Sequence, residues 1–337
     1  MGNMKTGSTY LQNFLYKNRE KLEENGISYT GAYEAPFYSH VIFSYALLRE
    51  TLENMGLIDN LSSSSICRRI KDETERLLAQ MLNHALNKSS NTIIISHEGL
   101  FSEVFRTAVG LYGNNYKGGL PDQAVFDTIA KSLHERLNNI LKSKFDKISI
   151  IIYLRRQDEY VKSMYNQYMK APWPEDNFPH MPSFDELYMR YNQTLSYKSI
   201  LDLIKSSYPG ANLTVYGYNP IDSNVQIHDV LRIAGADTDR IEENYDMPGA
   251  NARNSSLSRQ MLQFIHRFVP PEKAFDPEFL GKLTAIGNLT DEPGDLTDTS
   301  VDMSDKQKTV LSLKYSGENA IVNRLYISDK NRYIPDF

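Results

Sequence analysis

Apolar residues recur at helical spacing along much of the chain, which predicts amphipathic helices over residues 10–25, 40–57, 66–86 and 122–143. Gly26 follows the first of these segments and is its expected stop. Residues 91–98 and 147–154 each contain consecutive isoleucines, a pattern typical of strands buried on both faces of a parallel sheet. Helices that alternate with such strands predict an α/β fold.

Length and composition narrow this picture. A chain of 337 residues with 41% hydrophobic content can bury a sizeable core, and we expect one α/β domain over residues 1–337. A net charge of -5 argues against a general binder of nucleic acid or of anionic membranes. The single cysteine, Cys67, excludes an internal disulfide and a cysteine metal cluster. Without a long apolar run or a signal-peptide pattern, the chain is predicted to be cytoplasmic.

Candidate chemistry begins with residues 5–9, where Lys5, Thr6, Gly7, Ser8 and Thr9 stand directly before the first predicted helix. The N–H groups of a helix start, together with a lysine and several hydroxyls, can bind a phosphate or a sulfate. A polar turn that only caps the helix is the alternative interpretation. The order also differs from the nucleotide-hydrolase loop, where the lysine follows the second glycine.

The position of this loop is unusual, because such loops normally follow a buried strand. Only Met1 precedes Gly2 here. We therefore expect the first strand of the sheet to be missing or truncated, by roughly 5–6 residues.

A second candidate anion site follows the strand predicted over residues 147–154. Arg155 and Arg156 stand at the strand end, and Ser163 comes about two turns into the helix that begins there. Tyr160, Ser163 and Gln167 share one helix face. Arginines and an inward hydroxyl predict a phosphate clamp, and a solvated, charged helix start is the alternative.

Taken together, the two segments resemble those of PAPS-dependent sulfotransferases, where PAPS is 3′-phosphoadenosine 5′-phosphosulfate. Residues 5–9 resemble the loop of that family that binds the 5′-phosphosulfate, and residues 153–165 resemble its 3′-phosphate segment, with Arg155 and Ser163 on the matching positions. The resemblance implies a P-loop-like, doubly wound parallel sheet flanked by helices. It also implies that Lys5 neutralises the leaving oxygen, that residues 6–9 hold the 5′-phosphate, and that no metal is required.

Weaker similarity extends over most of the chain. Residues 212–216 and 225–234 resemble the next strand and helix of the family, and residues 251–258 and 318–326 resemble features of bacterial carbohydrate sulfotransferases. The expected activity is transfer of a sulfuryl group from PAPS to a hydroxyl or amine acceptor, with a carbohydrate as the expected acceptor class. Two alternatives are a nucleotide- or phosphosugar-binding module without transferase activity and a nucleoside kinase.

The catalytic base has several candidates. His97 and Glu98 follow the isoleucine-rich strand at its carboxyl end, where ligands bind in open α/β sheets. Histidine titrates near neutral pH, and burial can raise the pKa of a carboxyl group toward the same range. Because neighbouring strand residues point to opposite faces, only one of the two can face the sulfur. A residue elsewhere, such as His40, is the third possibility.

Two segments are candidates for the acceptor side. Residues 168–200 are rich in proline and aromatic residues, which predicts a loop, and Trp173 in it is a candidate for stacking on a sugar ring. Aromatic residues that pack a lid onto the core are the alternative. Residues 270–310 align with no part of the family, and their acidic part, residues 286–305, predicts a solvated loop.

Overall fold

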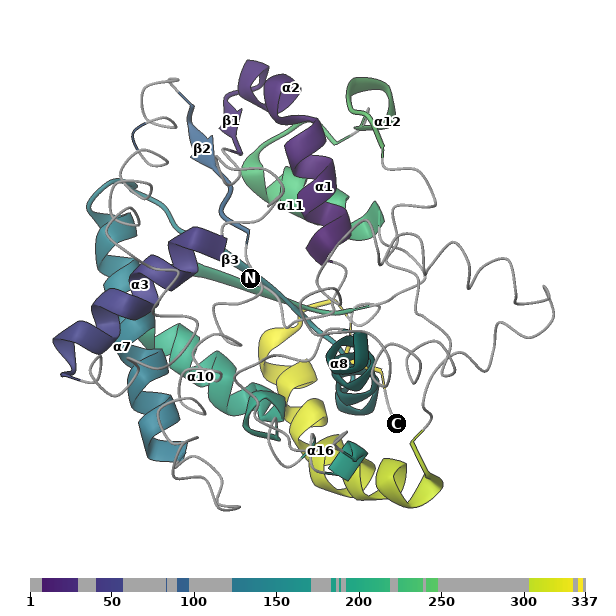
Figure 1. Cartoon of the computed structure of the whole chain (residues 1–337). Coiled ribbons are helices and arrows are strands. Elements are labelled where there is room, and N and C mark those ends of the chain that lie inside the picture. The colour runs from purple at the N-terminus through teal and green to yellow at the C-terminus, as the bar shows by residue number, and fades with distance from the viewer. Residues whose placement is uncertain are drawn as a thin grey trace.

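The computed structural model describes residues 8–29, 41–56, 83, 90–96, 123–170, 183–185, 188, 192–218, 224–238, 241–247, 303–329 and 333–335. The fold of this part is mixed α/β and mostly helical, with small parallel sheets (Figure 1). In chain order its elements are α1 (Ser8–Lys17), α2 (Arg19–Glu24), β1 (Ile27–Ser28), α3 (Val41–Asn54), β2 (Thr92–Ile93), α7 (Gln123–Lys142), β3 (Ser149–Leu154), α8 (Gln157–Lys170), the 3-10 helix η3 (Asn192–Leu195), α10 (Tyr197–Ser207), β4 (Asn212–Gly217), α11 (Asn224–Ala234), α12 (Ile241–Asn244) and α16 (Asp305–Tyr326).

The described strands form two parallel pairs. β1 pairs with β2 through Ile27 and Thr92, and β3 pairs with β4 over six residues, from Ser149 opposite Asn212 to Leu154 opposite Gly217. Parallel neighbours need a crossover connection, and between β3 and β4 the chain forms α8 and α10. The predicted α/β class is confirmed at this level, and the wider doubly wound sheet stays a prediction.

Helices cover both faces of the β3–β4 pair. Ile150, Ile152 and Leu154 point into one apolar cluster, whereas Ile151 packs against the other and Tyr153 contacts α11. This alternation follows from the two-residue period of a strand. In Figure 1, α7, α10 and α16 lie on one side of β3 and α1 and α11 on the other. The strand predicted over residues 147–154 is thus confirmed, with apolar packing on both faces.

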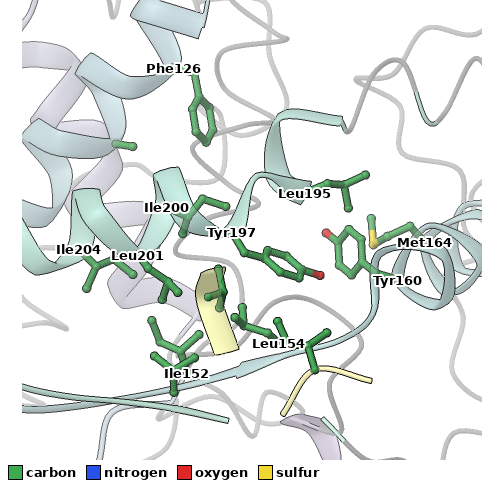
Figure 2. Packing of buried hydrophobic residues seen from close by; sticks show 14 of the residues in the cluster. Phe126, Ile152, Leu154, Tyr160, Met164, Leu195, Tyr197, Ile200, Leu201 and Ile204 are labelled. Atoms are coloured by element: carbon green, nitrogen blue, oxygen red, sulfur yellow. The ribbon is translucent and has the colours of Figure 1, made fainter. Parts of the chain in front are cut away.

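The larger cluster, here called the α7/α10 cluster, joins α7, β3, α8 and α10. Figure 2 shows α10 side chains above β3, with Tyr197 directed toward Tyr160 of α8. The central members of this cluster are Phe126, Ile129, Leu133, Leu137, Ile150, Ile152, Leu154, Tyr160, Met164, Tyr197, Ile200, Leu201 and Ile204. Each fully buried aliphatic or aromatic side chain contributes about 1.5–3 kcal/mol, so this cluster fixes where β3 ends and α8 begins.

The second cluster, here called the α1/α11 cluster, joins the first helices to residues more than two hundred positions later. It consists of Tyr10, Leu11, Phe14, Leu15, Leu22, Ile27, Tyr29, Ile227, Val230, Leu231, Ile241 and Tyr245. Polar contacts reinforce it, because the Asn18 side chain donates to the carbonyl of Asp246 at 3.0 Å and accepts from the N–H of Asp246 at 2.7 Å.

The helix predicted over residues 10–25 is present, but it is divided into α1 and α2. Asn18 separates them, and its side chain is occupied by Asp246 and by the carbonyl of Phe14 rather than directed to solvent. Gly26 ends the segment with φ at +72°, a conformation that glycine adopts without strain. The helices predicted over residues 40–57, 122–143 and 225–234 correspond to α3, α7 and α11.

Two sequence predictions need correction. β2 has only two residues, and the isoleucines at 93–95 are partly rather than fully buried: Ile94 packs on the α1/α11 cluster and Ile95 on the α7/α10 cluster. The loop predicted over residues 168–200 is wrong where α8 continues to its end and where η3 and α10 form; the prolines of that segment all precede residue 183.

Of the solvated loop expected over residues 286–305, the structure describes only residues 303–305, where Met303 and Ser304 precede α16, which begins at Asp305. The Ser304 hydroxyl accepts from the N–H of Gln307 at 3.3 Å, and the Gln307 side chain accepts from the N–H of Ser304 at 3.0 Å. This capping box stabilises the helix start. Among the helices of the described residues, none combines the length and apolar character needed to cross a membrane.

Candidate functional site

The site begins at the junction between β3 and α8. The strand ends at Leu154 and the helix starts at Gln157, so only Arg155 and Arg156 lie between them. The helical hydrogen bonds begin at once, because the N–H of Tyr160 donates to the carbonyl of Arg156 at 2.9 Å. The sequence prediction of an arginine at a strand end, directly before a helix, is confirmed.

Arg155 is held on several sides. Its Nε–H donates to Glu159 at 3.3 Å, and its guanidinium carbon lies 5.5 Å from the centre of the Tyr218 ring. Its backbone carbonyl accepts a hydrogen bond from the hydroxyl of Tyr197 at the start of α10. With 21% of its side chain exposed, Arg155 is a partly buried cation at the edge of the sheet.

Arg156 has a different role. It forms a bidentate pair with Asp158, at 2.7 and 3.0 Å, and a longer contact of 3.6 Å with Glu159. The hydrogen bond to Asp158 raises the pKa of Arg156 above its usual value. This pairing occupies the Arg156 guanidinium within the first turn of the helix, whereas Arg155 contacts Glu159 through its Nε–H alone among the described contacts.

Ser163 lies one helical turn beyond Glu159, so these two side chains share a face of α8. Ser163 is partly buried, whereas Tyr160 and Met164 are buried in the α7/α10 cluster. A carboxylate therefore stands between the two predicted 3′-phosphate ligands, Arg155 and Ser163. Glu159 was not predicted as a site residue, although its spacing of four positions from Arg155 is visible in the sequence.

A second group of contacts lies at the start of α1, directly after residues 5–7. The Tyr10 hydroxyl donates to Asn224 at 2.8 Å, and the side-chain amide of Gln12 donates to the Ser96 hydroxyl at 3.4 Å. Ser96 directly precedes His97 and Glu98 in the chain. The first turns of α1 are thus adjacent to the segment that leads to the candidate bases.

α11 contacts both α1 and β3. Asn224 accepts from Tyr10 of α1, and Asp229 accepts from the Tyr153 hydroxyl of β3 at 3.2 Å. Tyr153 also stacks on Tyr216 of β4, with ring centres 5.5 Å apart. The helix that follows residues 5–7 and the strand that leads to Arg155 are therefore anchored on the same short helix.

Several candidate residues lie outside the described residues: Lys5, Thr6, Gly7, His40, His97, Glu98 and Trp173. Ser8 and Thr9 form the first positions of α1, and their side chains are outside the description. Their assigned roles stay predictions. Of the predicted cofactor ligands, Arg155 and Ser163 are the two whose side chains the structure describes.

Other contacts support the junction and were not predicted from the sequence. Glu318 of α16 accepts from the backbone N–H of Lys198 at 2.7 Å and from the Ser196 hydroxyl at 3.2 Å, so it caps the start of α10. Tyr218 reaches Arg155 only because β3 and β4 pair in a particular register. Such contacts depend on tertiary structure, and local sequence patterns carry no signal for them.

Chemically, the junction offers an oriented cation and the positive end of a helix, both of which suit a phosphate or sulfate group. Comparisons of the chain with protein-family models, curated proteins and solved structures find no match. Its function is therefore inferred from its own residues.

Proposed function

We propose that this protein is a sulfotransferase that moves a sulfuryl group from PAPS to a hydroxyl or amine of an acceptor, with a carbohydrate as the acceptor class. The observation that supports the proposal is the contact of α11 with both α1 and β3, through Tyr10 and Tyr153. Residues 5–7 precede one of these elements and Arg155 follows the other. One bisphosphorylated nucleotide spanning both segments accounts for this arrangement.

In the proposed reaction, the acceptor oxygen or nitrogen attacks the sulfur, and the bond from the sulfur to the 5′-phosphate oxygen breaks. The acceptor proton passes to the base, Glu98 or His97, and the products are the sulfated acceptor and adenosine 3′,5′-bisphosphate. Lys5 neutralises the charge that develops on the leaving oxygen. Residues 6–9 bind the 5′-phosphate, and Arg155 and Ser163 bind the 3′-phosphate.

The proposal is tested by calorimetric titration of the full chain with adenosine 3′,5′-bisphosphate. We expect binding that weakens about 10- to 100-fold in Arg155→Ala, since a hydrogen bond to a charged group contributes about 1.5–3 kcal/mol. Arg49→Ala is the matched control, because Arg49 forms a similar pair with Glu53 on α3. A wild-type chain that does not bind the bisphosphate would contradict the proposal.

Lys5→Ala separates a transferase from a binding module. A transferase should lose turnover of PAPS far more than affinity for the bisphosphate, because Lys5 acts on charge that develops during the reaction. For the base, Glu98→Gln or His97→Ala should lower the rate by about 10²–10⁴. Rates within a few-fold of wild type in both variants would exclude both residues as the base.

A further inference from the structure

At the carboxyl end of the β3–β4 pair, the register decides which residue of the β4 chain lies beside Arg155. Tyr153 stands opposite Tyr216, and Leu154 stands opposite Gly217. The pairing continues one step further, because the N–H of Tyr218 donates to the carbonyl of Leu154 at 2.7 Å. Tyr218 is therefore the residue of the β4 chain next to Arg155.

This neighbourhood produces a cation–π contact. The Arg155 guanidinium carbon lies 5.5 Å from the Tyr218 ring centre, within the roughly 6 Å over which such contacts attract. Two residues earlier along the same strands, the rings of Tyr153 and Tyr216 also contact each other. The two cross-strand contacts are separated by the Leu154–Gly217 pair and therefore lie on the same face of the strands.

Glu159 and Tyr218, which both contact the Arg155 side chain, differ in how they affect the binding of an anion. Glu159 takes up an N–H donor and partly neutralises the charge. The Tyr218 ring attracts the guanidinium through its π face, which uses no N–H donor and adds no negative charge. An arginine side chain has about 2 kcal/mol of rotamer entropy, and a group that orients it in advance reduces the loss on binding.

We propose that Tyr218 is a positioning residue that orients Arg155, and that it thereby sets the preference of the site for a nucleotide with a 3′-phosphate over one without it. This inference rests on the proposed function, because it takes Arg155 as the 3′-phosphate ligand. We expect Tyr218 to affect only the binding of the 3′-phosphate end of the nucleotide.

The test compares two nucleotides by calorimetry on the full chain: adenosine 3′,5′-bisphosphate and adenosine 5′-monophosphate. Tyr218→Leu should reduce the ratio of the two affinities about 3- to 10-fold, by weakening the bisphosphate alone. Tyr218→Phe keeps the ring and should stay within about 2-fold of wild type. Tyr16→Leu is the matched control, since it removes another arginine–tyrosine contact, with Arg19 at 4.7 Å.

Each outcome of these titrations either supports or contradicts the positioning role of Tyr218. An unchanged ratio in Tyr218→Leu overturns the positioning role while the proposed function stands. The same holds if Tyr218→Phe behaves like Tyr218→Leu, because the hydroxyl rather than the ring would then matter. A wild-type chain that binds neither nucleotide overturns both. If Tyr218→Leu does not fold, Tyr218→Met provides a second ringless side chain, and the same loss of preference is expected.

Discussion

Gln157 and Asn319 bind each other through their side-chain amides, with two hydrogen bonds of 2.8 Å, although they stand 162 positions apart in the chain. Both residues are buried. Gln157 is the first residue of α8, so this pair attaches the β3–α8 junction, and with it Arg155, to α16.

The amide pair leads to the first prediction. Asn319→Leu should lower the free energy of unfolding by about 1–3 kcal/mol, because it leaves the buried amide of Gln157 without its main partner. The double variant Gln157→Met with Asn319→Leu should recover part of this loss, since no polar group is then left unsatisfied. Urea unfolding of the single and double variants measures both effects, and strictly additive losses would contradict the coupling.

Glu159 gives a second prediction, which concerns affinity. Its carboxylate contacts Arg155 at 3.3 Å and Arg156 at 3.6 Å, and a bound phosphate would meet it as a like charge. Glu159→Gln should therefore tighten binding of adenosine 3′,5′-bisphosphate roughly 3- to 10-fold at low salt, and less at high salt. The control is Glu53→Gln on α3, which also pairs with an arginine four positions away. Weaker binding of the bisphosphate by Glu159→Gln would contradict this prediction and would mean that Glu159 chiefly orients Arg155.

The burial of His134 leads to a third prediction, which concerns how the free energy of unfolding depends on pH. It is fully buried with its Nδ1 3.0 Å from the Tyr208 hydroxyl, and burial lowers its pKa to about 3. In the unfolded chain its pKa is about 6.5, so between these values the unfolded state binds the proton and the folded state does not. The buried, neutral His134 should therefore leave the free energy of unfolding unchanged above about pH 6.5. As the pH falls below this value, it should lower the free energy of unfolding progressively.

At pH 5 this cost is about 2 kcal/mol relative to neutral pH. His134→Gln should remove that part of the pH dependence while it keeps a polar partner for Tyr208. Unfolding curves of both proteins between pH 5 and pH 7.5 measure the difference, and parallel pH profiles would contradict the assignment.

Asn18 provides the fourth prediction. Its buried amide binds the carbonyl of Phe14 and both backbone groups of Asp246, so Asn18→Ala should cost about 1–3 kcal/mol of stability. Asn25 also donates to a backbone carbonyl, that of Lys21, but from an exposed position. Asn25→Ala should change stability by no more than about 0.5 kcal/mol. Equal losses in thermal unfolding would show that burial is not the deciding factor.

Much of the local structure could be predicted because its signal is contained in short windows. The periodic apolar positions of residues 122–143 correspond to α7, and the isoleucine run before Arg155 forms β3. The same reasoning failed for residues 192–200, where upstream prolines suggested a loop although the residues are helical. Prolines interrupt a helix only where they stand, and here they precede it.

The candidate site was predictable only in part. The positions of Arg155 and Ser163, after a strand and along the helix that follows it, could be predicted from the sequence, and their role as phosphate ligands stays a prediction. The contacts of Tyr218 and Asn319 could not be predicted, because they depend on strand register and on a helix that packs from far along the chain. Contacts of that kind arise from tertiary structure, to which local sequence patterns are blind.

The contact of Asn18 with Asp246 has a consequence for how the protein is made, since 228 positions separate the two residues. A ribosome that adds about 5–20 residues per second needs roughly 10 to 50 s to synthesise that interval. Throughout this time Phe14 and Leu15 lack the α11 and α12 side chains that later cover them. The apolar face of α1 is therefore buried by its native partners only late in synthesis.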